Sequence, residues 1–152
     1  MTFSNLPVAL PIITMELAVV LALLQAFLMF RVGNFRAKVD VPLGDGGNPA
    51  LLRRIRAHGN LTENAAIVLL LLAFAEMAGA PVLVVMSFAG VFLISRLANA
   101  VALSRESASL ALRGVGALGT VGSLVGLALT LFIVAEMATV GSQQVAILVA
   151  GH

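Results

Sequence analysis

Four long apolar stretches, separated by short polar connections, constrain the fold of this chain more than any other feature. They cover about residues 6–30, 49–77, 82–103 and 110–138. A helix needs about 20 apolar residues to cross the hydrocarbon core of a bilayer, and each stretch reaches that length. A helix also satisfies its backbone hydrogen bonds internally, as a lipid-exposed segment must. The pattern predicts an all-α integral membrane protein, a single four-transmembrane-helix bundle over residues 1–152.

The composition excludes several other classes of protein. Of the 152 residues, 61% are hydrophobic and only 11% are charged, whereas soluble domains carry about 25% charged residues. The net charge of +2 is small, so no nucleic-acid partner is expected. The chain has no cysteine, which excludes disulfides, thiolate metal ligands and a cysteine nucleophile. The first stretch has no preceding basic residue and is too long for the apolar core of a cleaved signal peptide.

The basic residues predict how the bundle is oriented. All nine lie around the first and third connections: Arg31, Arg36, Lys38, Arg53, Arg54, Arg56, Arg96, Arg105 and Arg113. The second connection, residues 76–81, has none. Lysine and arginine favour the cytoplasmic side of a membrane protein. We therefore expect cytoplasmic first and third connections, with both termini outside.

Turn-forming and small residues mark boundaries and close contacts. Asn48 and Pro49 are typical of the cap and first turn of a helix. The glycines at 44–47 match neither the P-loop nor the dinucleotide-binding pattern, so a phosphate site there is not favoured. In the fourth stretch, Gly122 and Gly126 form a small-xxx-small pattern, which predicts close helix packing.

A polar row begins the second apolar stretch. Arg56, Asn60 and Glu63 follow the spacing i, i+4, i+7 and so share one helix face, and Arg53 falls on the same stripe. Ionisable groups inside a membrane are costly unless paired, and they often mark a functional site. Arginine suits carboxylates, while Asn and Glu can accept hydrogen bonds from an amine. The row could therefore bind a small zwitterionic ligand.

The alternative is an internal salt bridge that holds the helices together, from Arg56 or Arg96 to Glu63. Arg96 lies several residues inside the third stretch and needs a partner there, Glu63 or a ligand carboxylate. His58 lies on a different helix face from the row. It either packs in a helix interface, faces the headgroups, or reaches a second pocket if chains associate.

These residues carry a resemblance to a known family. The Gly44–Gly47 loop is followed by Arg56-Ala57-His58-Gly59-Asn60-Leu61-Thr62-Glu63, which resembles the signature Arg-Ala-His-x-Asn-x-x-Glu of the MAPEG family. This is the family of membrane-associated proteins in eicosanoid and glutathione metabolism. Glu76–Gly79, and a third stretch that ends near Ser95-Arg96-Leu97, are also similar. The likeness covers most of the chain and suggests a bacterial-type member.

The resemblance implies a homotrimer with glutathione bound between neighbouring subunits, in the cytosolic half of the bilayer. It implies a glutathione transferase or peroxidase acting on lipophilic small molecules, in a bacterial inner membrane. Glutathione would be bound by Arg31, Arg56, His58, Asn60, Glu63 and Arg96. Arg113, at the start of the fourth stretch, would stabilise the glutathione thiolate.

The chain departs from the family pattern in one respect that concerns activity. Active members usually have tyrosines near the ligand, and this chain has none. The corresponding places hold Asn64, Asn99, Leu103 and Ala117. A non-catalytic member that binds another small anion, a lipid or a protein partner is therefore the alternative. A small transporter or channel is a third hypothesis, but paired broken helices and a filter motif are lacking.

Overall fold

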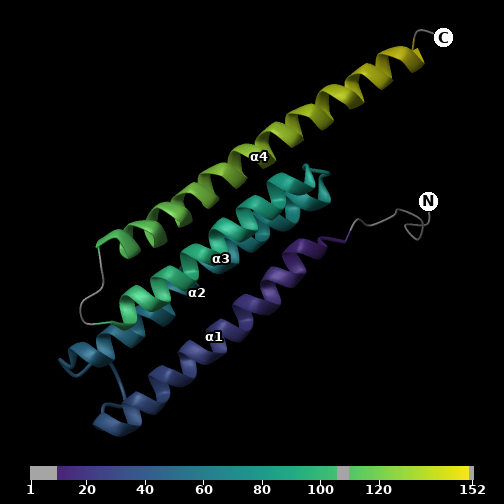
Figure 1. The fold of residues 1–152 in the computed structure, drawn as a ribbon. Coiled ribbons are helices and arrows are strands. Elements are labelled where there is room, and N and C mark those ends of the chain that lie inside the picture. Colours follow the sequence, from purple (N-terminus) through teal and green to yellow (C-terminus); the bar gives the residue numbers. More distant parts are fainter. Residues whose placement is uncertain (1–9, 106–109, 151–152) are drawn as a thin grey trace, which may run out of the picture.

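The computed structural model describes residues 10–105 and 110–150, which form four helices (Figure 1). These are α1 (Ile12–Val39), α2 (Pro49–Met77), α3 (Val82–Ser104) and α4 (Leu110–Ala150). All four are long and apolar enough to cross a membrane. The prediction of four spanning helices is confirmed.

The helices form a bundle with α2 and α3 at its centre. α2 packs against each of the other three helices, and α3 also packs against α1 and α4. Within the described residues α1 and α4 share no contact, and Figure 1 shows them on opposite sides of the central pair. Every contact between helices among the described residues therefore involves α2 or α3.

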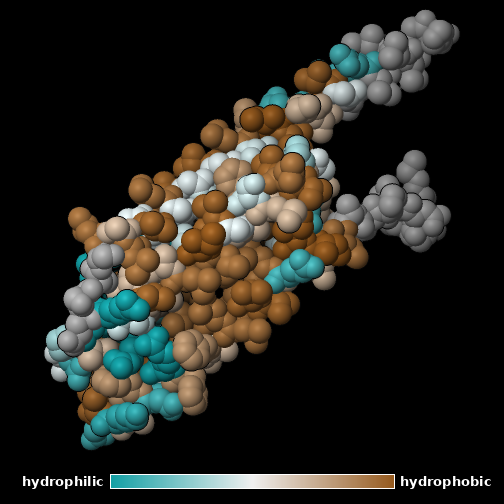
Figure 2. Space-filling model, in the orientation of Figure 1, coloured by the Kyte–Doolittle hydropathy of each residue, from teal (hydrophilic) through white to brown (hydrophobic). Residues whose placement is uncertain are grey.

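Buried side chains are few, and most of the apolar surface faces outward. The core includes Leu21, Leu61, Leu72 and Phe92, while Leu23 is 68% exposed. Figure 2 shows apolar residues covering the middle of the bundle and hydrophilic residues gathered at the end that holds the α1–α2 connection. This distribution suits a protein whose sides face hydrocarbon rather than water.

The first helix is displaced from its expected range of about residues 6–30. Residues 6–9 lie outside the described residues, and the helix continues past Arg31 to Val39. The sequence prediction stopped where the apolar run stops, but backbone hydrogen bonding continues through the basic turn. The helix ends at Asp40, whose φ of 53° is left-handed and whose N–H donates to the carbonyl of Arg36. α4 likewise continues past the expected residue 138.

The beginning of α2 confirms the prediction for Asn48 and Pro49. The Asn48 side chain accepts hydrogen bonds from the backbone N–H groups of Ala50 and Leu51 at 2.9 and 3.1 Å. Pro49 occupies the first turn, where its missing N–H has no intrahelical role. This cap fixes where the polar face of α2 begins.

The end of α2 caps the beginning of α1. The Glu76 carboxylate accepts from the backbone N–H groups of Ile13 and Thr14 at 2.9 and 3.0 Å, and from the Thr14 hydroxyl at 2.9 Å. A carboxylate at a helix N-terminus accepts hydrogen bonds from the unpaired N–H groups there. It is also attracted by the positive end of the helix dipole. Glu76 therefore joins two helices at the end of the bundle opposite the basic residues.

Glycines bring α4 close to α3, and one member of the expected pair, Gly126, is among them. A Cβ at Gly116 would lie 2.2 Å from Asn99, one at Gly119 would lie 2.8 Å from the Cβ of Ser95, and one at Gly126 would lie 2.3 Å from Phe88. A Cβ at Gly122 would meet nothing within 4 Å. Of the expected pair, Gly126 therefore packs closely against α3 and Gly122 does not, although residues four apart lie on the same side of a helix.

Candidate functional site

Arg96 of α3 connects three helices. It is 2% exposed, and its Nη1 donates to both the backbone and the side-chain oxygen of Asn60, at 2.8 and 2.7 Å. Its Nη2 donates to the Thr120 hydroxyl and, at 3.4 Å, to the carbonyl of Gly116. Its guanidinium carbon also lies 5.0 Å from the ring centre of Phe92. The positive charge of Arg96 is therefore compensated by neutral hydrogen-bond acceptors and an aromatic ring.

This arrangement corrects the expectation that Glu63 is the partner of Arg96 within the chain. Within the described part of the chain, no ion pair joins Glu63 to Arg96 or to Arg56, and the oxygens of Asn60 and Thr120 take that place. The alternative of an internal salt bridge was therefore wrong for both pairs. Glu63 and Arg56 remain exposed.

Arg56, Asn60 and Glu63 line one hollow, together with Leu103 of α3. The hollow has a volume of about 220 Å³. The row predicted from the i, i+4, i+7 spacing is therefore brought together on one side of α2. It offers a cation, an amide and a carboxylate over a short length of helix.

Arg96 orients the amide of Asn60 within this row. Because Asn60 Oδ1 accepts from Arg96 at 2.7 Å, its amide nitrogen is left with donors for another partner. The backbone carbonyl of Asn60 also accepts a hydrogen bond from the side-chain amide of Asn64 at 3.1 Å. The hollow thus combines one oriented amide donor with the guanidinium of Arg56 and the carboxylate of Glu63, neither of which forms an ion pair with another of the described residues.

His58 lies on the other side of α2, against α1. Its Nε2 is 2.8 Å from the amide nitrogen of Gln25, which also donates to the Thr62 hydroxyl at 2.8 Å. The Thr62 hydroxyl in turn donates to the carbonyl of His58 at 3.0 Å. Within one chain His58 is therefore an interface residue, as one interpretation of its helix position predicted.

Arg31 and Arg113 also lie outside the hollow lined by Arg56 and Glu63. Arg31 Nη1 donates to the Ser104 hydroxyl at 3.0 Å, on the α1–α3 side of the bundle. Arg113 is exposed in the first turn of α4, one turn before Gly116. One chain thus brings Arg56, Asn60, Glu63 and Arg96 together, and leaves Arg31, His58 and Arg113 apart from them.

Sequence reasoning did not identify the partners of several polar residues inside the apolar spans. Gln25 forms hydrogen bonds with His58 and Thr62 of α2. The hydroxyl of Ser104 accepts a hydrogen bond from Arg31, and that of Thr120 accepts one from Arg96. Polar side chains within a transmembrane helix tend to bond across to another helix, which would have identified all three as contact residues. Periodicity gave no indication of their partners.

No group of three or more metal-ligating side chains lies close enough together to hold a metal ion, within the residues that the structure describes. The site is thus a set of hydrogen-bonding and charged groups.

The fold and the site define a multi-pass integral membrane protein with a polar site among its spanning helices. The sequence model of the MAPEG family matches residues 14–133, and the chain belongs to this family. The resemblance drawn from the Arg56–Glu63 signature is confirmed.

Two curated relatives are bacterial. Inner membrane protein YecN of Escherichia coli strain K12 is 43% identical over 63 residues, which is 41% of this chain and 48% of YecN. YecN of Escherichia coli O6:H1 strain CFT073 matches to the same extent. The match thus spans about half the length of these relatives. No solved structure matches the chain significantly.

Proposed function

We propose that this protein binds glutathione at the hollow lined by Arg56, Asn60 and Glu63, and directs its thiol at lipophilic electrophiles. The observation that supports this is the grouping of these three side chains, with neither charged group taken up in an ion pair with the other. The guanidinium suits a glutathione carboxylate, and the carboxylate of Glu63 suits the ammonium group. The side-chain amide of Asn60 would donate a hydrogen bond to another oxygen of glutathione.

A second copy of the chain would complete this site. Glu63 is exposed at the middle of the spanning helix α2, where an ionisable group facing lipid is costly. The hollow of about 220 Å³ is smaller than the about 300–1,000 Å³ typical of ligand sites. In the proposed homotrimer a neighbour would cover Glu63, and could contribute its own His58 or Arg31.

Arg113 would favour the thiolate of bound glutathione. A free thiol has a pKa of about 8.5, so little of it is ionised at neutral pH, and a nearby guanidinium lowers that pKa. The thiolate sulfur then forms a bond to an electrophilic carbon, whose leaving group departs with the bonding electrons. A substrate that partitions into the bilayer would reach the thiolate from the lipid side.

The alternative is a non-catalytic member that uses the same hollow for another small anion, a lipid or a partner. The observation in its favour is the absence of tyrosine from the whole chain, because active relatives usually have tyrosines near glutathione. Arg113 also does not line the hollow of its own chain. The two functions share a binding site and differ in whether the thiol is activated.

We also propose a bacterial inner membrane as the location. The YecN relatives carry that description, and the basic residues around the first and third connections favour a cytoplasmic position for that end. Glutathione would then enter from the cytoplasm.

The test is a titration of glutathione into detergent-purified protein, with binding measured by calorimetry and thiolate by ultraviolet absorbance. Wild type should bind and give a thiolate signal. Arg113→Ala should bind without that signal, and Glu63→Gln should bind more weakly. Lys38→Gln, an exposed cation elsewhere, is the matched control. Binding without thiolate in wild type would favour the non-catalytic alternative, and no binding would overturn the glutathione assignment.

A further inference from the structure

Thr120 of α4 stands at one end of a series of hydrogen bonds that reaches the hollow on α2. Its hydroxyl donates to the carbonyl of Gly116, one turn earlier in α4, at 2.6 Å. A hydroxyl has a single proton, so the Thr120 oxygen acts as an acceptor for the Nη2 group of Arg96. The Nη1 group of the same guanidinium donates to the side-chain oxygen of Asn60 at 2.7 Å, and Asn60 lines the hollow. Hydrogen bonds therefore connect α4 to the face of α2 that lines the hollow.

Burial makes the orientation of Arg96 depend on the Thr120 hydroxyl. Thr120 is 7% exposed and Arg96 is 2% exposed, so water has little access to replace a lost oxygen. The nearby alternative acceptors are the Gly116 carbonyl and the Ser95 hydroxyl oxygen, each 3.4 Å from a nitrogen of the guanidinium. Without the Thr120 hydroxyl, the guanidinium would turn toward these more distant oxygens. Because the group is planar and rigid, its Nη1 would then turn away from Asn60.

The orientation of the Asn60 amide depends in turn on Arg96. An arginine only donates hydrogen bonds, so Arg96 can face the side-chain oxygen of Asn60 but not its NH₂ group. Among the described residues, the Asn60 side chain has no hydrogen-bond partner other than Arg96, which leaves the NH₂ group available to a ligand. An amide turned by half a rotation would offer an oxygen in its place. Arg96 therefore selects the orientation that offers a donor.

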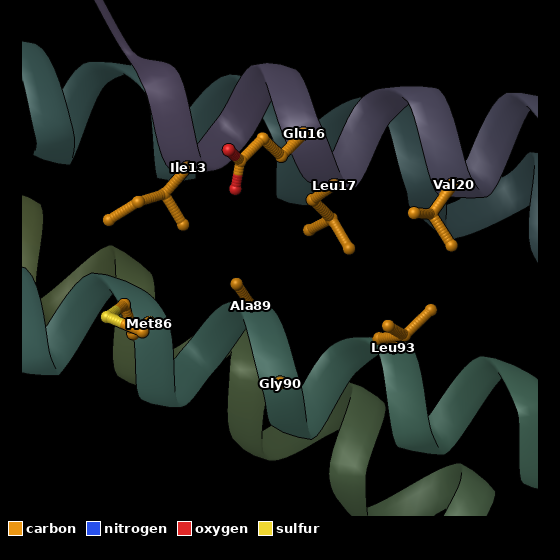
Figure 3. Close-up of a pocket in the computed structure, with 8 residues that line it drawn as sticks. All are labelled: Ile13, Glu16, Leu17, Val20, Met86, Ala89, Gly90 and Leu93. Atoms are coloured by element: carbon orange, nitrogen blue, oxygen red, sulfur yellow. The ribbon is translucent and has the colours of Figure 1, made fainter.

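A hollow between α1 and α3 lacks such an arrangement (Figure 3). It has a volume of about 250 Å³, and Glu16 is the charged residue among those that line it. The other lining residues are apolar or glycine, so no amide or cation is positioned beside this carboxylate. Glu16 therefore serves as a comparison, a carboxylate in a spanning helix that is not connected to the Asn60 amide.

We infer, on the basis of the proposed function, that Thr120 is a positioning residue for glutathione binding. By anchoring Arg96, it holds the Asn60 amide with its NH₂ group available to the ligand. Thr120 does not line the hollow, so it acts through Arg96 and Asn60 and not by contact with glutathione. Loss of its hydroxyl weakens binding in a protein that still folds.

The first test is the affinity for glutathione, measured by calorimetry in detergent-purified protein. Thr120→Val removes the hydroxyl and keeps the β-branched shape, and it should raise Kd about fivefold, the factor that corresponds to one net hydrogen bond. Thr120→Ser keeps the hydroxyl and should bind as wild type does. Ser123→Ala is the matched control, because Ser123 is also buried in α4 and its hydroxyl donates to Gly119 of the same helix at 2.7 Å. Ser123→Ala and Glu16→Gln should leave Kd unchanged.

A double-mutant cycle with Asn60→Ala distinguishes positioning from a general loosening of the bundle. If Thr120 acts through the Asn60 amide, Thr120→Val should change Kd by less than about twofold when that amide is already absent, whereas independent effects would multiply. The full loss of affinity in the Asn60→Ala background would overturn the inference. An unchanged Kd in Thr120→Val alone would also overturn it.

The side-chain amide of Asn60 provides a second readout, which does not need glutathione. Asn60→Ala identifies its NH₂ signals in nitrogen–proton correlation spectra of the ligand-free protein. These signals should shift in Thr120→Val and keep their wild-type positions in Thr120→Ser and Ser123→Ala. Unshifted signals in Thr120→Val would overturn the inference whether or not glutathione binds. Shifted signals in a protein whose wild type does not bind glutathione would support the orientation of Asn60 by Thr120 and overturn the proposed function.

Discussion

Arg96 shows how one residue can determine the packing of three helices. Its guanidinium donates to Asn60 of α2 and to Thr120 and Gly116 of α4, so removing it leaves the Asn60 side-chain oxygen without this donor. We predict that Arg96→Met lowers the free energy of unfolding by about 1–3 kcal/mol, the usual cost of a buried unsatisfied polar group. The measurement is reversible unfolding in mixed micelles, followed by circular dichroism.

Arg56→Met is the matched control for this prediction, because Arg56 is exposed and forms no ion pair with another residue of the described part of the chain. Its unfolding free energy should stay within about 0.5 kcal/mol of wild type, as is usual for surface substitutions. Equal effects of the two substitutions would contradict a special structural role for Arg96.

The same residues show what could be predicted at this scale. Helical spacing correctly placed Arg56, Asn60 and Glu63 on one face, because that depends only on residues within one helix. It did not identify the partner of Arg96, which depends on the rotation of α3 against α2 and α4. A buried cation needs compensation, but amide and hydroxyl oxygens can supply it as well as a carboxylate can.

At the scale of elements, the contact between α3 and α4 depends on particular glycines. A Cβ at Gly119 would lie 2.8 Å from the Cβ of Ser95, an atom fixed to the backbone of α3. Gly119→Ala should therefore push the helices apart and lower the free energy of unfolding by about 1–3 kcal/mol, as overpacking does. The same unfolding measurement tests it.

Gly122→Ala is the control within the same helix, because a Cβ there meets nothing within 4 Å. Alanine also favours a helix over glycine by about 0.5–1 kcal/mol, so this substitution should be neutral or slightly stabilising. A loss as large as that of Gly119→Ala would show that another surface covers this side of α4.

Glu76 connects the end of α2 to the start of α1 through three hydrogen bonds. We predict that Glu76→Ala lowers stability by about 1 kcal/mol, the typical value of a lost N-terminal cap. The loss should be local, seen as faster amide hydrogen exchange in the first turn of α1. Glu16→Ala, one turn further along α1, should leave that exchange unchanged. Unchanged exchange in Glu76→Ala would show that the cap does not hold the helix start.

At the scale of the whole molecule, hydropathy was sufficient for the fold, because crossing a bilayer fixes the length and type of each element. It was least accurate where helices leave the apolar region, as α1 does beyond Arg31. The full set of site residues, in contrast, does not follow from hydropathy. His58, Arg31 and Arg113 do not line the hollow of their own chain, so their proposed roles depend on neighbouring subunits, whose positions a single sequence does not specify.

The distribution of charge along the whole chain leads to a prediction of orientation. The nine basic residues adjoin the first and third connections, and the turn at Ala78–Pro81 has none. The chain has no cysteine, so a single introduced cysteine reports one position without interference. Leu43, in the first connection, is 88% exposed, and Ala78, in the second, is also exposed.

In intact spheroplasts, a membrane-impermeant maleimide should label Ala78→Cys, whereas Leu43→Cys should be labelled only after lysis. The physical reason is that positively charged connections are retained on the cytoplasmic side. That side would also hold the hollow lined by Arg56, which follows the first connection, and so give it access to cytoplasmic glutathione. Labelling of Leu43→Cys from outside would reverse the orientation, and a cytoplasmic glutathione supply would then no longer reach the site.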